Sequence, residues 1–200
     1  MTPRTDVTGF VVAGGKSSRM GRDKAWIDIG GRPMIQHVIS ALKEVTANIA
    51  VIAKRPEYGE LGFAVFADTH IGIGPIEAIR TALANCTTSY AIVVACDMPF
   101  VTPQLFTLLL DRVQGYDAVA PTDSEGRLEP LCAVYARAAG SAVTALVERG
   151  ERKPTRIFDT VRTNIAPFSA VGHLPGAQLF FRNVNTPADY MQALQDHTLD

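Results

Sequence analysis

Short apolar runs alternate along the chain with segments in which apolar residues recur every three or four positions. The runs are rich in Val, Ile and Ala and predict buried strands at residues 7–13, 49–53, 63–67, 90–96, 118–120 and 131–135. The periodic segments predict amphipathic helices that begin near residues 33, 75, 102, 138 and 186. A proline stands at or beside four of these five starts, which supports them because proline suits the first turn of a helix.

The order of these elements indicates the fold class. Strands that alternate with helices favour right-handed crossovers and a mostly parallel central sheet, so we expect an α/β protein. Residues 149–175 are more polar and less regular, and we expect them to wrap the edge of the sheet. Because no repeat, low-complexity tract or linker divides the sequence, residues 1–200 are predicted to form a single domain.

Composition and charge narrow the possible partners. The chain has 19 basic and 20 acidic side chains, a net charge of −1, so neither nucleic acid nor an anionic membrane is an expected partner. No signal peptide and no apolar run of membrane-spanning length is found, and a cytoplasmic protein is expected. The three cysteines show no metal-binding spacing, and Cys96 and Cys132 are predicted to be core residues.

The loop after the first predicted strand, AGGKSSRMGRDK at residues 13–24, carries the most distinctive chemistry. Gly14 and Gly15 allow a sharp turn whose backbone N–H groups can surround phosphate oxygens. The loop also contains four basic residues, namely Lys16, Arg19, Arg22 and Lys24. A glycine turn with solvated cations is the alternative interpretation, but so many positive charges in a short loop favour a triphosphate ligand. The pattern is neither a Walker loop nor GxGxxG.

Residues 12–24 resemble the LAGGxSxRMGxDK signature of the molybdenum cofactor guanylyltransferases, with Val12 in place of Leu. The resemblance implies a three-layer, Rossmann-like nucleotidyltransferase fold with a mostly parallel central sheet. It also implies a reaction: the terminal phosphate of Mo-molybdopterin attacks the α-phosphorus of GTP and expels pyrophosphate, with Mg²⁺ as cofactor. The residues to which it assigns nucleotide binding here are Val12, Ala13, Gly14, Gly15 and Lys24. Arg19 and Lys24 are the expected catalytic cations, and Arg19 is also expected to contact the pterin.

Asp97 directly follows the fourth predicted strand. Ligands of such sheets bind beyond the carboxyl ends of the strands, so Asp97 is expected to face the same crevice as the glycine-rich loop. A carboxylate suits Mg²⁺, although an aspartate that only caps a turn is the alternative. Residues 96–100, CDMPF, resemble a family element whose Asp binds both Mg²⁺ and the nucleotide. Asp97 is therefore expected to be a catalytic, metal-binding and nucleotide-binding residue.

Four further segments are assigned mainly by the resemblance. It implies that Asp68 contacts the nucleotide and that Gly74 borders the pterin, although on sequence alone Gly74-Pro75 is more simply a helix entry. In NVNTP at residues 183–187, Asn183 and Asn185 point the same way on an extended segment, and amides suit the polar edge of a pterin. Glu129-Pro130-Leu131 matches an EPL-like element or is a strand-entry turn. The basic pair at residues 152–153 lies near the pterin phosphate or is solvated.

Several functions remain open from the sequence. The double glycine at 14–15 resembles the guanylyl rather than the cytidylyl enzymes of the class, but CTP stays the first alternative. A catalytically silent nucleotide-binding partner in cofactor delivery is a second, and a sugar-phosphate nucleotidyltransferase a third. Molybdenum insertion proteins or recipient molybdoenzymes are the implied protein partners. The scattered histidines show no metal pair or triad, and no GxSxG motif supports a hydrolase.

Overall fold

A seven-stranded sheet forms the centre of the protein, in a computed structural model that describes residues 2–14, 23–70 and 72–197. Its spatial order is β5-β4-β1-β6-β8-β7-β9. The strands are β1 (Arg4–Val12), β4 (Thr46–Ile52), β5 (Ala64–Phe66), β6 (Tyr90–Ala95), β7 (Ala118–Pro121), β8 (Cys132–Ala136) and β9 (Thr163–Ala166). A separate hairpin pairs β2 (Asp28–Ile29) with β3 (Arg32–Pro33).

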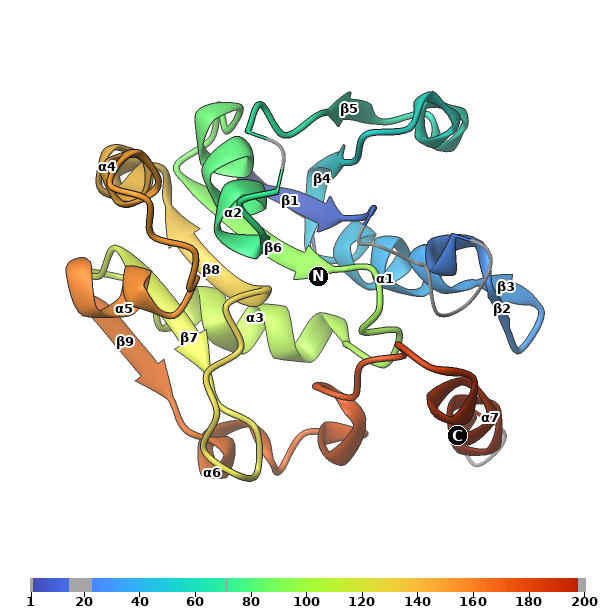
Figure 1. Cartoon of the computed structure of the whole chain (residues 1–200). Helices are drawn as coiled ribbons and strands as arrows, with labels where there is room; N and C mark the ends of the chain where they lie inside the picture. Colours follow the sequence, from blue (N-terminus) through green and yellow to red (C-terminus); the bar gives the residue numbers. More distant parts are fainter. Residues whose placement is uncertain (1, 15–22, 71, 198–200) are drawn as a thin grey trace.

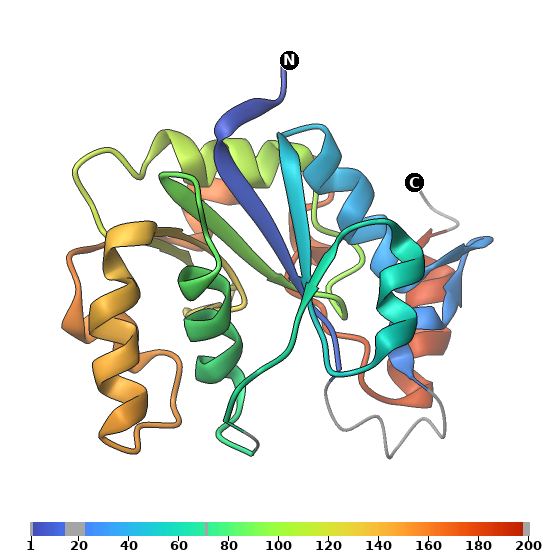
Figure 2. The ribbon, with the colours of Figure 1, turned by 90° about the horizontal axis from the view of Figure 1, so that it is seen from above.

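Helices cover both faces of this sheet, which gives three layers (Figure 1; Figure 2). They are α1 (Met34–Lys43), α2 (Pro75–Ala84), α3 (Pro103–Asp111), α4 (Gly140–Glu148), α5 (Arg156–Thr160), α6 (Phe168–Val171) and α7 (Pro187–His197). Helices α1 and α3 pack on one face, and α2, α4 and α5 on the other. The α/β fold with a mostly parallel central sheet is therefore confirmed.

The central strands are buried on both sides because their apolar side chains alternate between the two faces. In β1, Val7 and Val11 join the core under α1 and α3, whereas Phe10 joins the core under α2 and α4. All three are fully buried. Burial on both faces also explains why β6 is a nearly continuous apolar run rather than an alternating one. Cys96 and Cys132 are buried, as predicted.

The strand directions at one side of the sheet differ from a simple parallel pattern. Strand β8 runs antiparallel to both β6 and β7, whereas β1, β4, β5 and β6 are mutually parallel. Consequently the segment that enters β8, residues 129–131, lies at the same edge as the carboxyl ends of the parallel strands. The sequence pattern predicted the strand but not its direction.

The polar segment at residues 149–175 does reach the sheet edge, but it is more regular than its sequence indicated. It contains α5, β9 and α6, and β9 pairs in parallel with β7 as an edge strand. Strand β9 is only four residues long, and two of these are Thr163 and Asn164, so it contains no apolar run that would have predicted it.

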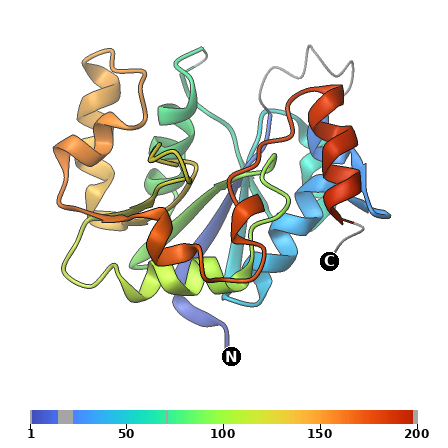
Figure 3. The same cartoon turned by 90° about the horizontal axis from the view of Figure 1, so that it is seen from below.

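The C-terminal helix α7 lies beside the β2–β3 hairpin (Figure 3). A small apolar cluster of Ile29, Met34, Val184 and Ala193 joins the two, all of them buried. This packing places the segment before α7, residues 183–186, against the end of β6. Within the described part of the chain, no helix is long and apolar enough to cross a membrane.

Candidate active site

A cavity of about 740 Å³ opens at the carboxyl ends of the parallel strands. The segments that follow β1, β4, β5 and β6 line it, together with the entry to β8 and the segment before α7. Its polar lining side chains are Lys24, Lys54, Asp68, His70, Asp97, Glu129, Asn183 and Asn185. The volume is typical of a pocket that holds a small-molecule ligand.

Most of the sequence-predicted site residues that the structure describes line this cavity. They are Val12, Ala13, Gly14, Lys24, Asp68, Gly74, Asp97, Asn183 and Asn185. Gly15 and Arg19 lie outside the described residues, as do the basic residues Lys16 and Arg22. Residues 152 and 153 are exposed and are not among the described lining residues, although the neighbouring Pro154 is.

An ion pair between Lys24 and Asp97 forms the polar centre of the cavity. The Lys24 ammonium nitrogen lies 2.5 Å from Asp97 Oδ2, and the two side chains are only 14% and 12% exposed. The same ammonium donates a hydrogen bond of 2.7 Å to Asn185 Oδ1. The fold thus brings residues 73 and 161 positions apart into one cluster. A cation, a carboxylate and an amide are placed where a phosphate-bearing ligand can contact all three.

Lys24 is positioned by a short 3₁₀ turn, residues Lys24–Trp26, that Asp23 caps. The Asp23 carboxylate accepts the Ala25 N–H at 3.2 Å and the Tyr58 hydroxyl at 2.8 Å. Tyr58 is fully buried, and its ring lies 5.5 Å from that of Trp26. Burial and the hydrogen bond to Asp23 raise the pKa of Tyr58 well above its usual range, so the phenol stays a donor. The hydrogen bond from Tyr58 to Asp23 therefore holds the turn that carries Lys24.

Asp97 and the NVNTP segment are held together by the backbone. The Val184 N–H donates to the Asp97 carbonyl at 2.9 Å, which ties residues 183–185 to the end of β6. Asp189 then accepts the N–H groups of Asn185 and Thr186 at 3.0 and 2.8 Å, while Thr186 Oγ1 accepts the Asp189 N–H. This reciprocal capping starts α7 and fixes the backbone that carries the two amide side chains.

The opposite side of the cavity is built on β4, β5 and α2. Asp68 follows β5 and accepts a 3.3 Å hydrogen bond from Thr81 Oγ1 of α2. Burial raises the pKa of Asp68, and the nearby Lys54 opposes that rise. Gly14 and Gly74 border this side with φ values of +106° and +102°, a backbone region that favours glycine. Both glycines are thus required by the backbone that shapes the cavity.

Glu129 is a half-buried carboxyl on the cavity wall. Burial raises its pKa to about 7, and the negative charges of Asp123 and Asp97 add to the rise. The antiparallel direction of β8 explains why this residue, at the start of its strand, faces the same edge as residues at the ends of β1 and β6.

Comparison with known proteins identifies the family of the chain. A model of the MobA-like NTP transferase domain matches residues 9–164. The chain belongs to this family. A probable molybdenum cofactor guanylyltransferase from Pelotomaculum thermopropionicum is 35% identical over 187 residues, which cover 93% of this chain and 91% of that protein. A molybdenum cofactor guanylyltransferase from Shewanella sp. (strain MR-4) is 33% identical, over 90% of this chain and 91% of that protein.

A solved structure shares the fold. Molybdopterin-guanine dinucleotide biosynthesis protein A from Archaeoglobus fulgidus superposes on this chain with a TM-score of 0.82 and 24% sequence identity. The superposition covers 96% of this chain and 100% of that one. The Rossmann-like nucleotidyltransferase fold expected from the glycine-rich loop is thus confirmed for this MobA-like transferase.

Sequence reasoning missed two features of this MobA-like transferase. Tyr58 and His70 gave no signal, because their partners, Asp23 and Glu77, follow from folding rather than from spacing. Asp23 did have a signal: it directly precedes Lys24 in the signature loop, where an N-cap aspartate is common. The residues next to His70 in the sequence do not show that its ring pairs with Glu77, a buried carboxylate on α2.

Proposed function

We propose that this chain transfers GMP from GTP to the terminal phosphate of Mo-molybdopterin, which yields pyrophosphate and the guanine dinucleotide form of the cofactor. One observation carries the proposal: Lys24, Asp97 and Asn185 meet in the cavity that also contains Gly14. The chain's relatives at 33–35% identity are named molybdenum cofactor guanylyltransferases, which supports the choice of substrates.

The chemistry needs positioning and charge neutralisation more than covalent help. An oxygen of the pterin phosphate attacks the α-phosphorus of GTP. As this P–O bond forms, the bond from the α-phosphorus to the oxygen bridging to the β-phosphate breaks, and the electron pair leaves with pyrophosphate. The attacking phosphate is already ionised at neutral pH, so no general base is required. Lys24 neutralises the charge that develops at the α-phosphate, with Arg19 as the second proposed catalytic cation.

Each half of the cavity takes one substrate in this proposal. Val12, Ala13, Gly14 and Gly15 hold the nucleotide through the loop after β1, and Asp68 contacts it from the end of β5. Asn183 and Asn185 face the pterin, with Arg19 at its border, and Gly74 is proposed to contact the pterin from the α2 side of the cavity. The hydrogen bond from Lys24 to Asn185 supports this division, because it joins the cation to the residue proposed to contact the acceptor.

Asp97 would hold a magnesium ion, which would supply positive charge beside the triphosphate. Its carboxylate lies in the cavity at 12% exposure, and Mg²⁺ commonly takes one or two carboxylates with phosphate oxygens and water. Among the described residues no cluster of three or more potential ligands occurs, so the phosphates must supply much of the coordination. When bound, the ion would neutralise phosphate charge.

The substrates and the class of the protein can be tested together. We expect calorimetry in the presence of Mg²⁺ to show binding of GTP but not of CTP, ATP or UTP. Pyrophosphate should then be released only when Mo-molybdopterin is added. Preferential binding of CTP would indicate a cytidylyltransferase, and GTP binding without pyrophosphate release would indicate a silent carrier. We further propose that the chain acts as one domain in the cytoplasm, where its product passes to insertion proteins or recipient molybdoenzymes.

A further inference from the structure

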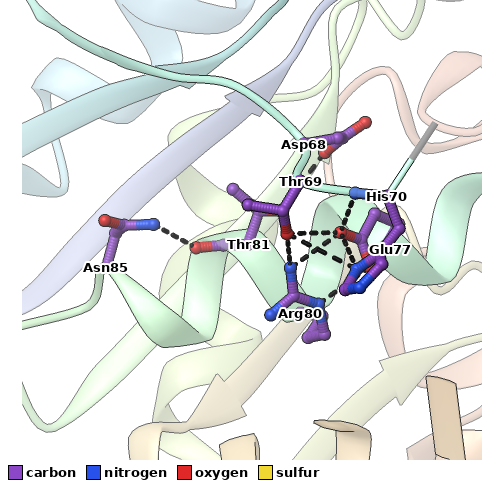
Figure 4. A network of polar contacts seen from close by, with 7 residues as sticks. All are labelled: Asp68, Thr69, His70, Glu77, Arg80, Thr81 and Asn85. Atoms are coloured by element: carbon purple, nitrogen blue, oxygen red, sulfur yellow. Dashed lines mark hydrogen bonds and ion pairs between the residues drawn. The ribbon is translucent and has the colours of Figure 1, made fainter. Parts of the chain in front are cut away.

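A buried carboxylate on α2 organises the loop that forms one wall of the cavity. Glu77 stands in the first turn of α2 and is only 1% exposed. Figure 4 shows its side chain pointing toward Thr69 and His70, which belong to the loop between β5 and α2. The last residues of this loop, Gly72 and Gly74, line the cavity, as does His70 itself.

Glu77 accepts hydrogen bonds from both the backbone and the side chain of His70. The His70 N–H donates to Oε1 at 3.0 Å, and its ring Nδ1 lies 3.1 Å from the same oxygen. Thr69 Oγ1 also donates to Oε1, at 3.1 Å, and Arg80 donates to both oxygens, at 2.7 and 2.8 Å. A buried carboxylate with this many donors is well satisfied and holds the loop in one place.

The ionisation state of Glu77 determines which hydrogen-bonding role Nδ1 of His70 takes. Burial alone would raise the pKa of Glu77, but the hydrogen bonds from Arg80, His70 and Thr69 outweigh burial and hold it at about 2. The carboxylate is therefore ionised and can only accept hydrogen bonds. It follows that His70 Nδ1 carries the hydrogen in this contact and that Nε2 is the nitrogen available to a ligand.

The position of His70 places it with the proposed nucleotide residues. It lies two positions after Asp68, and both line the cavity with Lys54 on the side built from β4 and β5. The imidazole is 56% exposed, and its hydrogen bonds to the described residues are all made through Nδ1. Nε2 of a neutral imidazole accepts hydrogen bonds and pairs with the N–H and O–H groups of a nucleoside, whereas Nε2–H of a protonated imidazole donates and pairs with phosphate oxygens. Binding of a polyphosphate that lacks a nucleoside distinguishes the two.

We propose that His70 contacts the nucleoside part of the bound nucleotide through Nε2, and that Glu77 is the positioning residue that holds the ring for this contact. The inference rests on the proposed function, because it places the nucleotide in this half of the cavity. It adds a recognition residue that acts on binding rather than on the chemical step, since the chemical step is assigned to Lys24 and Asp97, which contact each other.

The test compares GTP binding by the full-length wild type with three variants: His70→Ala, Glu77→Gln and the double variant. Loss of one hydrogen bond predicts that His70→Ala raises the Kd for GTP about 3-fold to 10-fold. The kcat at saturating GTP should stay within about 2-fold of wild type. Because Glu77 acts through His70, the double variant should bind GTP no more than about 2-fold more weakly than the weaker-binding single variant. Additive losses, or an unchanged Kd in His70→Ala, would overturn the proposal.

Two controls separate this contact from other effects. Inorganic tripolyphosphate lacks a nucleoside, so His70→Ala should leave its binding unchanged; an equal loss would assign the contact to phosphate and refute the nucleoside assignment. His173→Ala is the control for His70→Ala and removes an exposed imidazole. Asp117→Asn is the control for Glu77→Gln and changes a carboxylate that accepts a backbone N–H at 3.0 Å. Neither residue lines the cavity. Both should bind GTP normally. If Glu77→Gln does not fold, the Kd values of His70→Ala for GTP and for tripolyphosphate still decide whether His70 contacts the nucleoside. A wild type that fails to bind GTP would refute the proposed function, not this contact.

Discussion

Replacing Lys24 by Met tests the central electrostatic claim of the proposed mechanism. The substitution keeps the length of an unbranched side chain but removes the ammonium that lies 2.5 Å from Asp97 and 2.7 Å from Asn185. Two unit charges about 4 Å apart interact by about 4 kcal/mol at an effective dielectric constant of about 20. If Lys24 stabilises the charge that develops at the α-phosphate by this amount, the rate falls about 1,000-fold.

The expected loss is moderated because the Lys24 side chain is 14% exposed, so water screens part of the interaction. We therefore expect kcat to fall between about 100-fold and 1,000-fold, the range found when a single stabilising donor is removed from an active site. Lys24→Met also leaves Asp97 without its ammonium partner. Since Asp97 borders an open cavity, water can replace the partner, and we expect a loss of stability of only about 1–2 kcal/mol.

The assay is steady-state pyrophosphate release with GTP, Mg²⁺ and Mo-molybdopterin, accompanied by thermal unfolding. A loss of about 1–2 kcal/mol corresponds to a fall in Tm of about 2–8 °C for a chain of this size, so the variant should be folded at assay temperature. Lys43→Met is the matched control, because Lys43 lies on α1 over the Phe63 ring, 5.5 Å from its centroid, and outside the cavity. A folded Lys24→Met variant with a kcat within 10-fold of wild type would refute the assigned role.

Two further predictions follow from the environment of Lys24 and from Glu129. Tyr58→Phe removes the 2.8 Å hydrogen bond to Asp23 and should cost about 1–3 kcal/mol of stability. Its kcat should fall by a larger factor than its KM for GTP changes. The control is Tyr116→Phe, which removes the hydroxyl of an exposed ring and should change neither. Because burial and neighbouring carboxylates raise the pKa of Glu129 from 4.5 to about 7, the folded state retains a proton that the unfolded state releases, and stability falls as pH rises from 4.5 to 7. Glu129→Gln should remove this fall and be more stable than wild type at pH 8 by about 1–3 kcal/mol, as denaturant titrations at pH 5 and pH 8 would show. Equal pH dependence in the two proteins would contradict the assigned environment of Glu129.

The apolar pattern predicted the central strands well because each of them is buried on both faces. Residues 7–11 of β1 and residues 91–95 of β6 are all buried, and both stretches contain β-branched residues, which favour strands. The edge strand β9 was missed for the opposite reason: its burial is partial, and its pairing with β7 supplies a stabilisation that its own sequence does not show. Propensity is weakest where tertiary pairing decides the structure.

The site was predictable where its residues directly follow strands. Gly14, Asp68 and Asp97 each come within two residues of the end of a parallel strand, and the carboxyl ends of such strands meet at one edge. Asn183 and Asn185 came from the family resemblance, since nothing in their spacing shows that the Val184 N–H bonds to the Asp97 carbonyl. The Tyr58–Asp23 and His70–Glu77 pairs depend on side chains that meet only in the folded chain.

The antiparallel strand β8 explains how one cavity can take two phosphate-bearing substrates. With only parallel strands, the wall beyond β6 would be formed by another strand end, but the reversal of β8 places its entry segment and Glu129 there instead. Helix α7 closes the same side, through a backbone hydrogen bond that joins Val184 to the residue at the end of β6. The two sides of the cavity therefore have different origins: the parallel strands form the side proposed to bind the nucleotide, and β8 with the segment before α7 forms the side proposed to bind the acceptor. Lys24 bonds to both Asp97 and Asn185 and so lies where the two sides meet, which is where the proposed function places the attacking phosphate and the α-phosphate.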